Sequence, residues 1–392
     1  MSKESAASVY NSGSLHPNAC RAAFFASGLV SAAWASMIPF LKLHLMIDEA
    51  VLGILLLCIG LGGLASMPFS GRLVSFFGCQ RLLLTVSSVL AVLLMLLCDT
   101  ARLPVCAVLL LFFGVCSGIL DVSINIFALH LENLLARRLM SGMHGMWSLG
   151  TFAGAGGFSL FLQTGFTVYE AILCMVLLVL FLTTFYSRYV GADIGRQRFS
   201  SGGDSRLSLP KGVVVWLGVA ACIAFQAEST LADWGGLFLV EVRGFELSVS
   251  SLGFSLFSAA MLLMRLSGDR VIQRLGEKPV VFGGTCLAIL GFLLLLLVPL
   301  PEAALIGFFL IGVGAANTVP VIFSIIGRQK AMPLNTAMSA VGTIGYCGSL
   351  TGPALIGFAA QQISLLFSFT LLLLLLIVLQ LLLLKVYRSM KP

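Results

Sequence analysis

The chain contains a series of apolar segments, each about as long as a membrane-spanning helix and separated from the next by a short polar break. A helix needs about 20 apolar residues to cross the hydrocarbon layer of a bilayer. Hydrophobic residues make up 59% of the 392 residues and charged residues only 10%, whereas a soluble domain has roughly 25% charged residues. The chain therefore has too few charged side chains to cover a water-facing surface, and we expect it to lie in a lipid bilayer.

The apolar segments predict α-helices. Transmembrane β-strands would alternate apolar with polar residues, and a run such as residues 371–384 shows no such alternation. Twelve segments of the required length can be placed along the chain. The expected helices lie at residues 22–41, 50–70, 82–98, 103–130, 142–163, 167–187, 212–238, 249–267, 279–298, 303–326, 334–359 and 364–384. The sequence thus predicts an all-α membrane protein with twelve transmembrane helices.

The distribution of Lys and Arg predicts the orientation in the membrane. Cytoplasmic loops of membrane proteins carry an excess of basic residues. If both ends of the chain are cytoplasmic, the outer loops contain three of the 23 basic residues, Lys42, Arg102 and Arg243, and all the others fall on the inner side. The pattern predicts a multi-pass protein with a cytoplasmic tail at each end, residues 1–21 and 385–392. Because the basic residues are scattered over many loops, we expect no nucleic-acid partner.

The longest polar break predicts a division into two halves. Residues 188–211 are rich in Gly, Ser and Arg, which is typical of a flexible linker. This linker would be cytoplasmic. It would join one six-helix bundle, residues 22–187, to a second, residues 212–384.

The two halves also resemble each other, at offsets of 200, 198 and 196 residues. A duplicated six-helix unit is how many transporters build a solute site between two repeats. We therefore expect two pseudo-symmetric bundles and transport by alternating access. The matching positions are Trp34, Leu52 and Gly53 with Trp234, Leu252 and Gly253, then residues 72–78 with residues 270–276, and then Phe112, Phe113, Gly118 and Asp121 with Phe308, Phe309, Gly314 and Asn317.

The duplication, the basic linker and a Gly-Arg-Leu-x-x-x-x-Gly motif after the second helix resemble the major facilitator superfamily. Arg72 and Gly78 of this motif have the counterparts Arg270 and Gly276 in the second half. The resemblance implies the major facilitator fold, secondary active transport and a role for these four residues in gating loops. The acidic residue that is usual in the motif is replaced by Ser75.

A narrower resemblance is carried by residues 121–125 in the fourth helix, 143–150 in the fifth and 228–234 in the seventh. These stretches look like the YbjJ-like permeases of the bacterial inner membrane, which are distantly similar to fucose/proton symporters. The resemblance implies an inner-membrane protein that couples protons to the movement of a small, sugar-like solute. In the fucose symporters the acid that matches Asp121 is a proton and sugar site.

The match to the fucose symporters is incomplete. Their acid in the first helix aligns near Ala35, and their Gln and Asn in the fifth helix fall at His144 and Trp147. These departures argue against fucose itself as the solute. Because the glycines of the fifth helix partly resemble the glycine-rich motif of drug antiporters, the alternative function is proton-driven export of drugs or amphiphilic metabolites.

Acidic side chains inside spanning helices are the candidates for proton coupling, because an ionisable group costs about 2.5 to 3.5 kcal/mol there. Asp121 lies one turn from Ser117 and one turn from Asn125, so these polar groups share one stripe of their helix. A carboxyl group holds its proton more tightly in a poorly hydrated cavity than in water. Alternation between the two environments would couple proton movement to that of a solute bound at Asn125. The alternative is a structural Asp121 that bonds to a neighbouring helix.

Three further titratable groups are candidates. Glu228, beside the solute-binding candidate Gln226 near the middle of its helix, is predicted either to couple protons or to hold helices together. Asp233 lies closer to the outer end, where it would cap an unwound segment before Gly235 or contact the solute. His144 titrates near neutrality and is predicted to share a proton or to act at an inner gate.

Other side chains are candidates for direct contact with the solute. Trp34, Trp147 and Trp234 offer stacking faces for a sugar ring, although a tryptophan in a membrane protein is often an interface anchor or a packing group. Asn317, the repeat counterpart of Asp121, can hydrogen-bond a solute without charge.

No catalytic constellation is evident among the four histidines and the few membrane acids, which show no Ser-His-Asp set, metal-ligand spacing or phosphate loop. We therefore expect no enzymatic activity, no cofactor and no metal. The expected partners are a small-molecule solute, protons and the lipid bilayer, and we expect a monomer.

Overall fold

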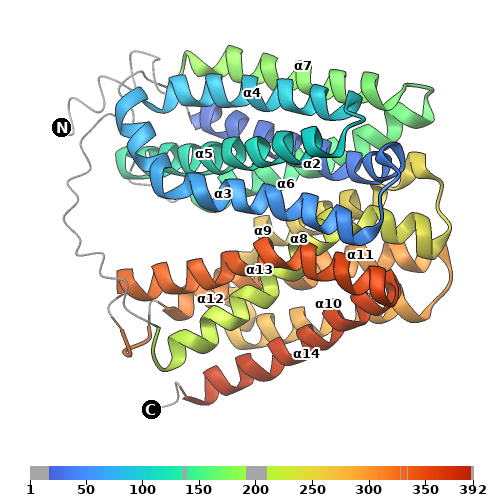
Figure 1. Cartoon of the computed structure of the whole chain (residues 1–392). Coiled ribbons are helices and arrows are strands. Elements are labelled where there is room, and N and C mark those ends of the chain that lie inside the picture. Colours follow the sequence, from blue (N-terminus) through green and yellow to red (C-terminus); the bar gives the residue numbers. More distant parts are fainter. Residues whose placement is uncertain (1–16, 136–138, 191–209, 327, 333, 390–392) are drawn as a thin grey trace. The chain divides into compact units, whose positions relative to one another are not determined.

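The computed structural model describes residues 17–135, 139–190, 210–326, 328–332 and 334–389. Every regular element in these ranges is helical (Figure 1), which confirms the all-α prediction. A short 3-10 helix, η1 (Leu247–Val249), precedes α9. The α-helices are α2 (Pro17–Leu45), α3 (Glu49–Phe77), α4 (Cys79–Asp99), α5 (Leu103–Leu135), α6 (Met140–Gln163), α7 (Val168–Ser187), α8 (Val213–Arg243), α9 (Leu252–Leu275), α10 (Glu277–Leu297), α11 (Pro301–Ala315), α12 (Thr318–Ile326), α13 (Leu334–Gln362) and α14 (Leu365–Ser389).

Most of the helices are long and apolar enough to cross a membrane. Ten spans in the described part of the chain meet this criterion, and α11 with α12 counts as one of them. The two further helices of the predicted twelve, α6 and α13, are long but rich in Gly and Ser. The twelve-helix prediction agrees with this arrangement, and the chain is a multi-pass membrane protein.

The glycines of α6 and α13 allow close contact with neighbouring helices. Gly150 of α6 lies against the backbone carbonyl of Phe25 in α2, and Gly348 of α13 lies against that of Cys222 in α8. A side chain at either glycine would collide with backbone, so close helix packing requires glycine at both positions. Gly157 has open space around it and makes no such contact.

The predicted continuous helix at residues 303–326 is wrong, because α11 ends at Ala315 and α12 begins at Thr318. Pro320 explains the interruption. It has no N–H to donate to the carbonyl of Ala316, and its ring would clash with that carbonyl in a regular helix. By contrast, α8 runs without interruption through Gly235, so the unwound segment predicted after Asp233 is also wrong.

A single glycine joins α3 to α4, and another joins α9 to α10. Gly78 has φ 81° and ψ 155°, and Gly276 has φ 85° and ψ 157°. This backbone conformation is accessible almost only to glycine. The Gly-Arg-Leu-x-x-x-x-Gly motif lies mostly within a helix, since Arg72 falls in α3 and its counterpart Arg270 falls in α9. The last glycine of the motif, Gly78 or Gly276, has the same backbone geometry in both halves.

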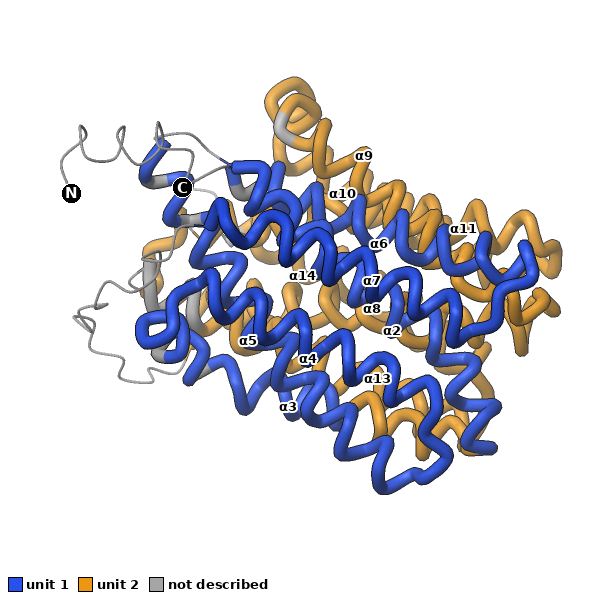
Figure 2. Tube along the Cα trace, turned by 90° about the horizontal axis from the view of Figure 1, so that it is seen from above, with its two compact units in different colours: residues 1–46, 58–201 blue, residues 47–57, 202–392 orange. Residues whose placement is uncertain are grey.

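The contacts within the chain define two compact units (Figure 2). Unit 1 contains residues 1–46 and 58–201, and unit 2 contains residues 47–57 and 202–392. In unit 1, α2 packs most extensively against α6 and next against α7; in unit 2, the equivalent α8 packs most extensively against α13 and next against α14. The same pairing in both units agrees with a duplicated bundle. Most of the predicted linker, residues 188–211, lies outside the described residues.

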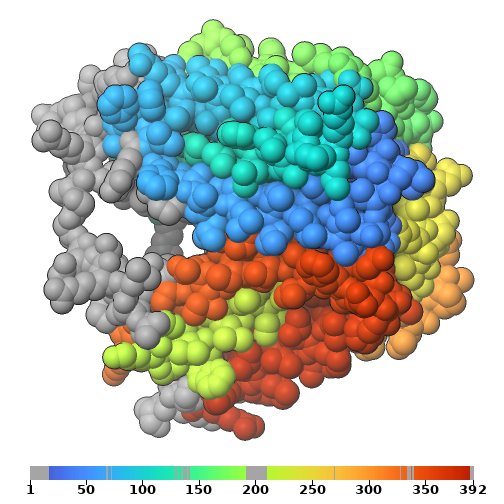
Figure 3. Space-filling view, viewed as in Figure 1, coloured from blue at the N-terminus to red at the C-terminus, as the bar shows by residue number. Residues whose placement is uncertain are grey.

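The outer faces of the helices carry large apolar side chains. Figure 3 shows residues 58–77 of α3, together with α4 and α5, as a continuous surface on one face of unit 1. Exposed side chains there include Val92 and Leu96 of α4 and Val108 and Phe112 of α5. Such an apolar surface would be unfavourable in water and is stable against lipid tails.

Candidate functional site

The predicted polar stripe of unit 1 is present on α5. Asp121 is exposed, and Ser117 and Asn125 are partly buried. The side-chain amide of Asn125 donates to the backbone oxygen of Asp121 at 2.8 Å and to its carboxylate Oδ1 at 3.2 Å. The structure therefore brings Asp121 and Asn125 together within one helix. The amide orients the carboxylate, and the carboxylate keeps surface on which a proton or a solute can bind.

The other candidates of unit 1 lie on α6 and α2. His144 of α6 is exposed, and its ring packs edge to face against Phe24 of α2, with the ring centroids 5.3 Å apart. Trp147, one turn further along α6, is partly buried. Trp34 of α2 is buried, and its ring lies 5.8 Å from that of Phe113. Trp34 thus belongs to the core of unit 1 in this structure.

Unit 2 contains an ion pair between two spanning helices. Glu228 is the middle residue of α8, and its Oε2 lies 3.8 Å from Nη2 of Arg265 in α9. The sequence prediction counts Arg265 among the basic residues of the inner side and does not pair it with Glu228. In the structure Arg265 lies ten residues before the end of α9. The available signal is an arginine inside an otherwise apolar stretch of a predicted helix.

A small cavity adjoins Glu228 inside unit 2. Glu228 is its charged lining residue, and Thr285 and Thr318 supply hydroxyl groups. These hydroxyls donate to backbone carbonyls of their own helices, at 2.8 Å for Thr285 and 3.5 Å for Thr318, so their lone pairs can still accept hydrogen bonds. The other lining residues are Ala224, Ala227, Leu231, Phe257, Ala288, Ile311, Gly314, Ala315, Leu376 and Leu379.

The interruption between α11 and α12 lies at the edge of this cavity, because Ala315 and Thr318 both line it. Discontinuous helices in transporters often carry solute or ion sites, since the interruption leaves backbone groups without partners in the helix. Asn317, inside the interruption, is buried with its Oδ1 against Gly268 of α9. It therefore packs between helices of unit 2.

The remaining candidates of α8 divide between core and partly exposed positions. Trp234 is completely buried, and its indole N–H donates to the backbone oxygen of Pro353 in α13 at 3.1 Å. Gln226 and Asp233 are partly buried. Gln226 packs against Gly352 of α13. Trp234 thus ties α8 to α13, whereas Gln226 and Asp233 keep some accessible surface.

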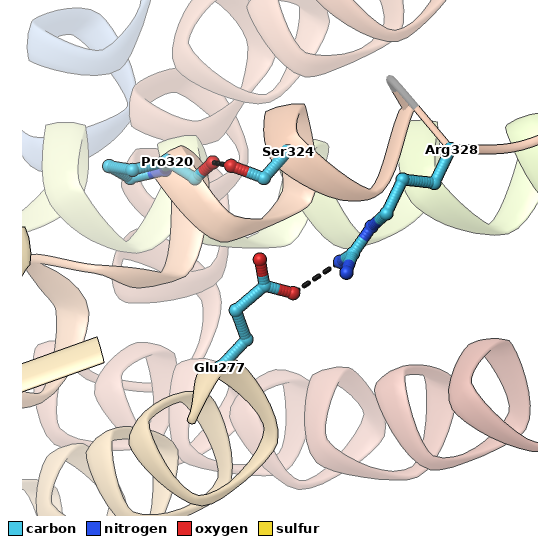
Figure 4. A network of polar contacts seen from close by, with 4 residues as sticks. All are labelled: Glu277, Pro320, Ser324 and Arg328. Carbon is cyan, nitrogen blue, oxygen red and sulfur yellow. Dashed lines mark hydrogen bonds and ion pairs between the residues drawn. The ribbon is translucent and has the colours of Figure 1, made fainter. Parts of the chain in front are cut away.

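The gating candidates lie where α3 meets α4 and where α9 meets α10. Arg270 is exposed, and the side chain of Arg72 lies outside the described residues. Glu277, the first residue of α10, follows Gly276 directly. It forms an ion pair with Arg328, which follows α12 (Figure 4). The pair fastens the chain after α12 to the start of α10. In the same view the hydroxyl of Ser324 donates to the backbone oxygen of Pro320 at 3.1 Å.

The part of the chain that the structure describes shows no group of three or more His, Cys, Asp or Glu side chains placed to hold a metal ion. The titratable side chains described above in the helices include Asp121, His144, Glu228, Asp233 and Arg265. Such groups can bind protons and polar solutes.

Curated relatives cover most of the chain. An uncharacterized MFS-type transporter of Yersinia pestis is 39% identical over 350 residues, which are 89% of this chain and 90% of that protein. An uncharacterized transporter of Sinorhizobium fredii is 31% identical over 89% of this chain and 92% of that protein. The membrane protein MosC of Rhizobium meliloti is 30% identical over 87% of this chain and 83% of that protein.

Solved structures show the same fold at low identity. A point mutant of the nucleoside transporter NupG superposes with a TM-score of 0.76 at 14% identity, over 95% of this chain and 100% of that chain. The human organic anion transporter MFSD10 superposes with a TM-score of 0.64 at 17% identity, over 94% of this chain and 100% of that chain. The family model of the Major Facilitator Superfamily matches residues 21–331 and 248–392. With its two equivalent helical units, the chain belongs to the major facilitator superfamily.

Proposed function

We propose that the chain is a proton-coupled secondary transporter of the bacterial inner membrane that moves a small polar solute by alternating access. Its family and its bacterial relatives support secondary transport of a small molecule. The likeness to a nucleoside transporter is compatible with a small polar solute. The resemblance of residues 121–125 to the fucose/proton symporters favours a sugar-like one.

The carboxyl group of Asp121 is the observation that carries the proposal. It lies within a spanning helix, is exposed, and is held by Asn125 at 3.2 Å. An exposed acid in such a helix can exchange protons with water and then be transferred to a drier environment. A proton that moves down a potential of 100 mV releases about 2.3 kcal/mol, which supports roughly 50-fold accumulation of a neutral solute.

The other predicted residues have secondary roles in this proposal. Glu228 and His144 are further sites for a proton, and the solute contacts the accessible surface of Trp147, Gln226 and Asp233. The glycine-linked helix ends at residues 72–78 and 270–276 form the gating region. We further propose that both termini are cytoplasmic and that the protein acts as a monomer.

Transport by the purified chain in proteoliposomes tests the proton-carrier role. We expect Asp121→Asn to lower accumulation driven by a proton gradient at least about tenfold, while exchange of labelled for unlabelled solute without a gradient persists. A panel of sugars and nucleosides serves as the probe. The matched control is Asp99→Asn, because Asp99 is the exposed last residue of α4. Full gradient-driven accumulation by Asp121→Asn would show that Asp121 is not the proton carrier.

A proton-driven exporter of drugs or amphiphilic metabolites is the second candidate. The cavity beside Glu228 favours it, since Glu228 and two threonines are the polar side chains in an otherwise apolar lining. Efflux of hydrophobic cations from vesicles, with no uptake of sugars or nucleosides, would establish export in place of uptake.

A further inference from the structure

One face of α14 changes from apolar to basic toward the C-terminal end of the helix. Leu374, Val378, Leu381, Lys385 and Arg388 follow one another at alternating spacings of four and three residues. Side chains at these spacings lie on the same side of a helix. All five side chains are exposed. Helix α14 therefore presents to its surroundings an apolar strip that ends in two cations.

The length of this strip matches one leaflet of a bilayer. Eleven residues separate Leu374 from Lys385, which is about 16 Å along the helix axis. Half of a hydrocarbon layer about 30 Å thick measures about 15 Å. When Lys385 lies at the level of the lipid headgroups, the strip therefore extends as far into the membrane as the acyl chains of one leaflet do.

A tryptophan of the neighbouring helix α8 holds the ammonium group of Lys385. The Nζ atom of Lys385 lies 3.7 Å from the ring centre of Trp216, close enough for the ring face to attract the cation. Lys385 is exposed, so the side of the ammonium that faces away from the ring keeps N–H groups that can donate to an anion. Tryptophan is enriched at the headgroup level of membrane proteins, which supports the same level for Lys385.

The sequence around the two cations contains no carboxylate. Residues 365–392 include neither Asp nor Glu, and the first acid of α8, Glu228, comes twelve residues after Trp216. That separation is about 18 Å along the helix axis. Glu277 at the start of the adjacent α10 forms its ion pair with Arg328. The charge of this part of α8 and α14 is therefore positive and complementary to an anionic headgroup.

We propose that the start of α8 and the end of α14 bind an anionic phospholipid, with its phosphate on Lys385 and Arg388 and its acyl chains along Leu381, Val378 and Leu374. The site is separate from the proposed transport function. The guanidinium of Arg388 can donate two parallel N–H bonds to phosphate oxygens, and the ammonium of Lys385 acts as a point charge. Both cations repel the positive group of a zwitterionic headgroup, so the site selects a lipid with net negative charge. In the proposed orientation it lies in the cytoplasmic leaflet.

Matched lipids test this site. Phosphatidylglycerol and phosphatidylcholine with the same acyl chains are added to the purified full chain in detergent. Native mass spectrometry measures their affinities, and thermal unfolding measures their stabilising effect. We expect the wild type to bind phosphatidylglycerol at least about tenfold more tightly than phosphatidylcholine and to unfold at a higher temperature with it. Lys385→Gln should weaken phosphatidylglycerol binding about fivefold, and the double variant with Arg388→Gln about 25-fold, with phosphatidylcholine binding unchanged.

Two further positions separate a built site from a diffuse charge effect. Arg274→Gln removes one exposed cation from α9 and should bind phosphatidylglycerol like the wild type. Trp216→Leu keeps the net charge but removes the ring that holds Lys385, so the preference for phosphatidylglycerol should fall about two- to threefold. Trp216→Phe keeps an aromatic face and should retain most of the preference. Phosphatidylcholine binding by each variant is the reference for intact folding.

The proposal is wrong if the two lipids bind equally, or if Lys385→Gln and Arg274→Gln weaken phosphatidylglycerol binding to the same extent. Glycerol phosphate without acyl chains is the soluble probe. If it stabilised the protein as well as phosphatidylglycerol does, the ligand would be a free phosphate compound and not a lipid. A failure of proton-driven transport would leave the lipid site standing, because lipid binding is measured without solute and without a gradient.

Discussion

The guanidinium of Arg243, the last residue of α8, reaches the backbone oxygens at the end of α10. Its Nε donates to Leu295 at 3.0 Å, its Nη2 donates to Leu296 at 3.0 Å, and a further bond joins Nη2 to Leu295. The last carbonyls of a helix have no partner within it. Arg243 supplies that partner from a neighbouring helix, and its charge lies 5.4 Å from the ring centre of Phe238.

Replacing Arg243 should therefore lower the stability of unit 2. We expect Arg243→Leu to cost about 1 to 3 kcal/mol, because charged hydrogen bonds are lost and backbone oxygens are left unpaired. Arg243→Lys should cost less, since an ammonium group keeps the charge but donates to fewer of these oxygens at once. Thermal unfolding in detergent measures both, with Arg274→Leu as the exposed control. Equal melting temperatures for Arg243→Leu and wild type would contradict this role.

Residue spacing made part of the candidate site predictable. Asp121 and Asn125 are four positions apart, and a helix brings such positions to the same face, where the structure shows their hydrogen bond. The pairing of Glu228 with Arg265 depends on the packing of two helices that are distant in sequence, and no spacing rule relates them. For the same reason the burial of Trp34 and Trp234 could not be read from the sequence, since it depends on which neighbours cover each ring.

Individual helices were predictable from apolar length, but their interruptions were not. A proline within an apolar run is tolerated in many membrane helices, because neighbours can satisfy the freed backbone groups. The sequence around Pro320 therefore reads as one span, while the structure ends α11 at Ala315 and begins α12 at Thr318. Glycine was more informative, because the strained backbone at Gly78 and Gly276 accepts no other residue readily.

The joint between α9 and α10 should be sensitive to a single methyl group. We expect Gly276→Ala to destabilise the protein by about 1 to 3 kcal/mol, because its φ of 85° with ψ of 157° is strained for alanine. Gly283→Ala in α10 is the control, since open space surrounds that helical glycine and alanine favours a helix by about 1 kcal/mol. Thermal unfolding compares the two variants. If the two variants unfolded at the same temperature, backbone strain would not explain why glycine occupies position 276.

For the whole molecule, the basic residues predict an orientation that fusion proteins can check. Loops at Gly165 and Gly276 should face opposite sides of the membrane, with Gly276 and the C-terminus in the cytoplasm. Alkaline phosphatase should be active when fused after Gly165 and inactive when fused after Gly276, and a green fluorescent protein should fluoresce at the C-terminus. Phosphatase activity at Gly276 would invert the proposed topology.

The single-residue joints at Gly78 and Gly276 have a mechanical consequence for the molecule. With one residue between them, the end of α3 and the start of α4 stay next to each other, and so do the end of α9 and the start of α10. The adjoining ends of each pair should therefore move together. The interrupted span of α11 and α12 is the opposite case, since two residues outside regular helix separate its segments and allow a bend. Motion in unit 2 should therefore concentrate at Ala316 and Asn317, where the two segments of this span can bend relative to each other.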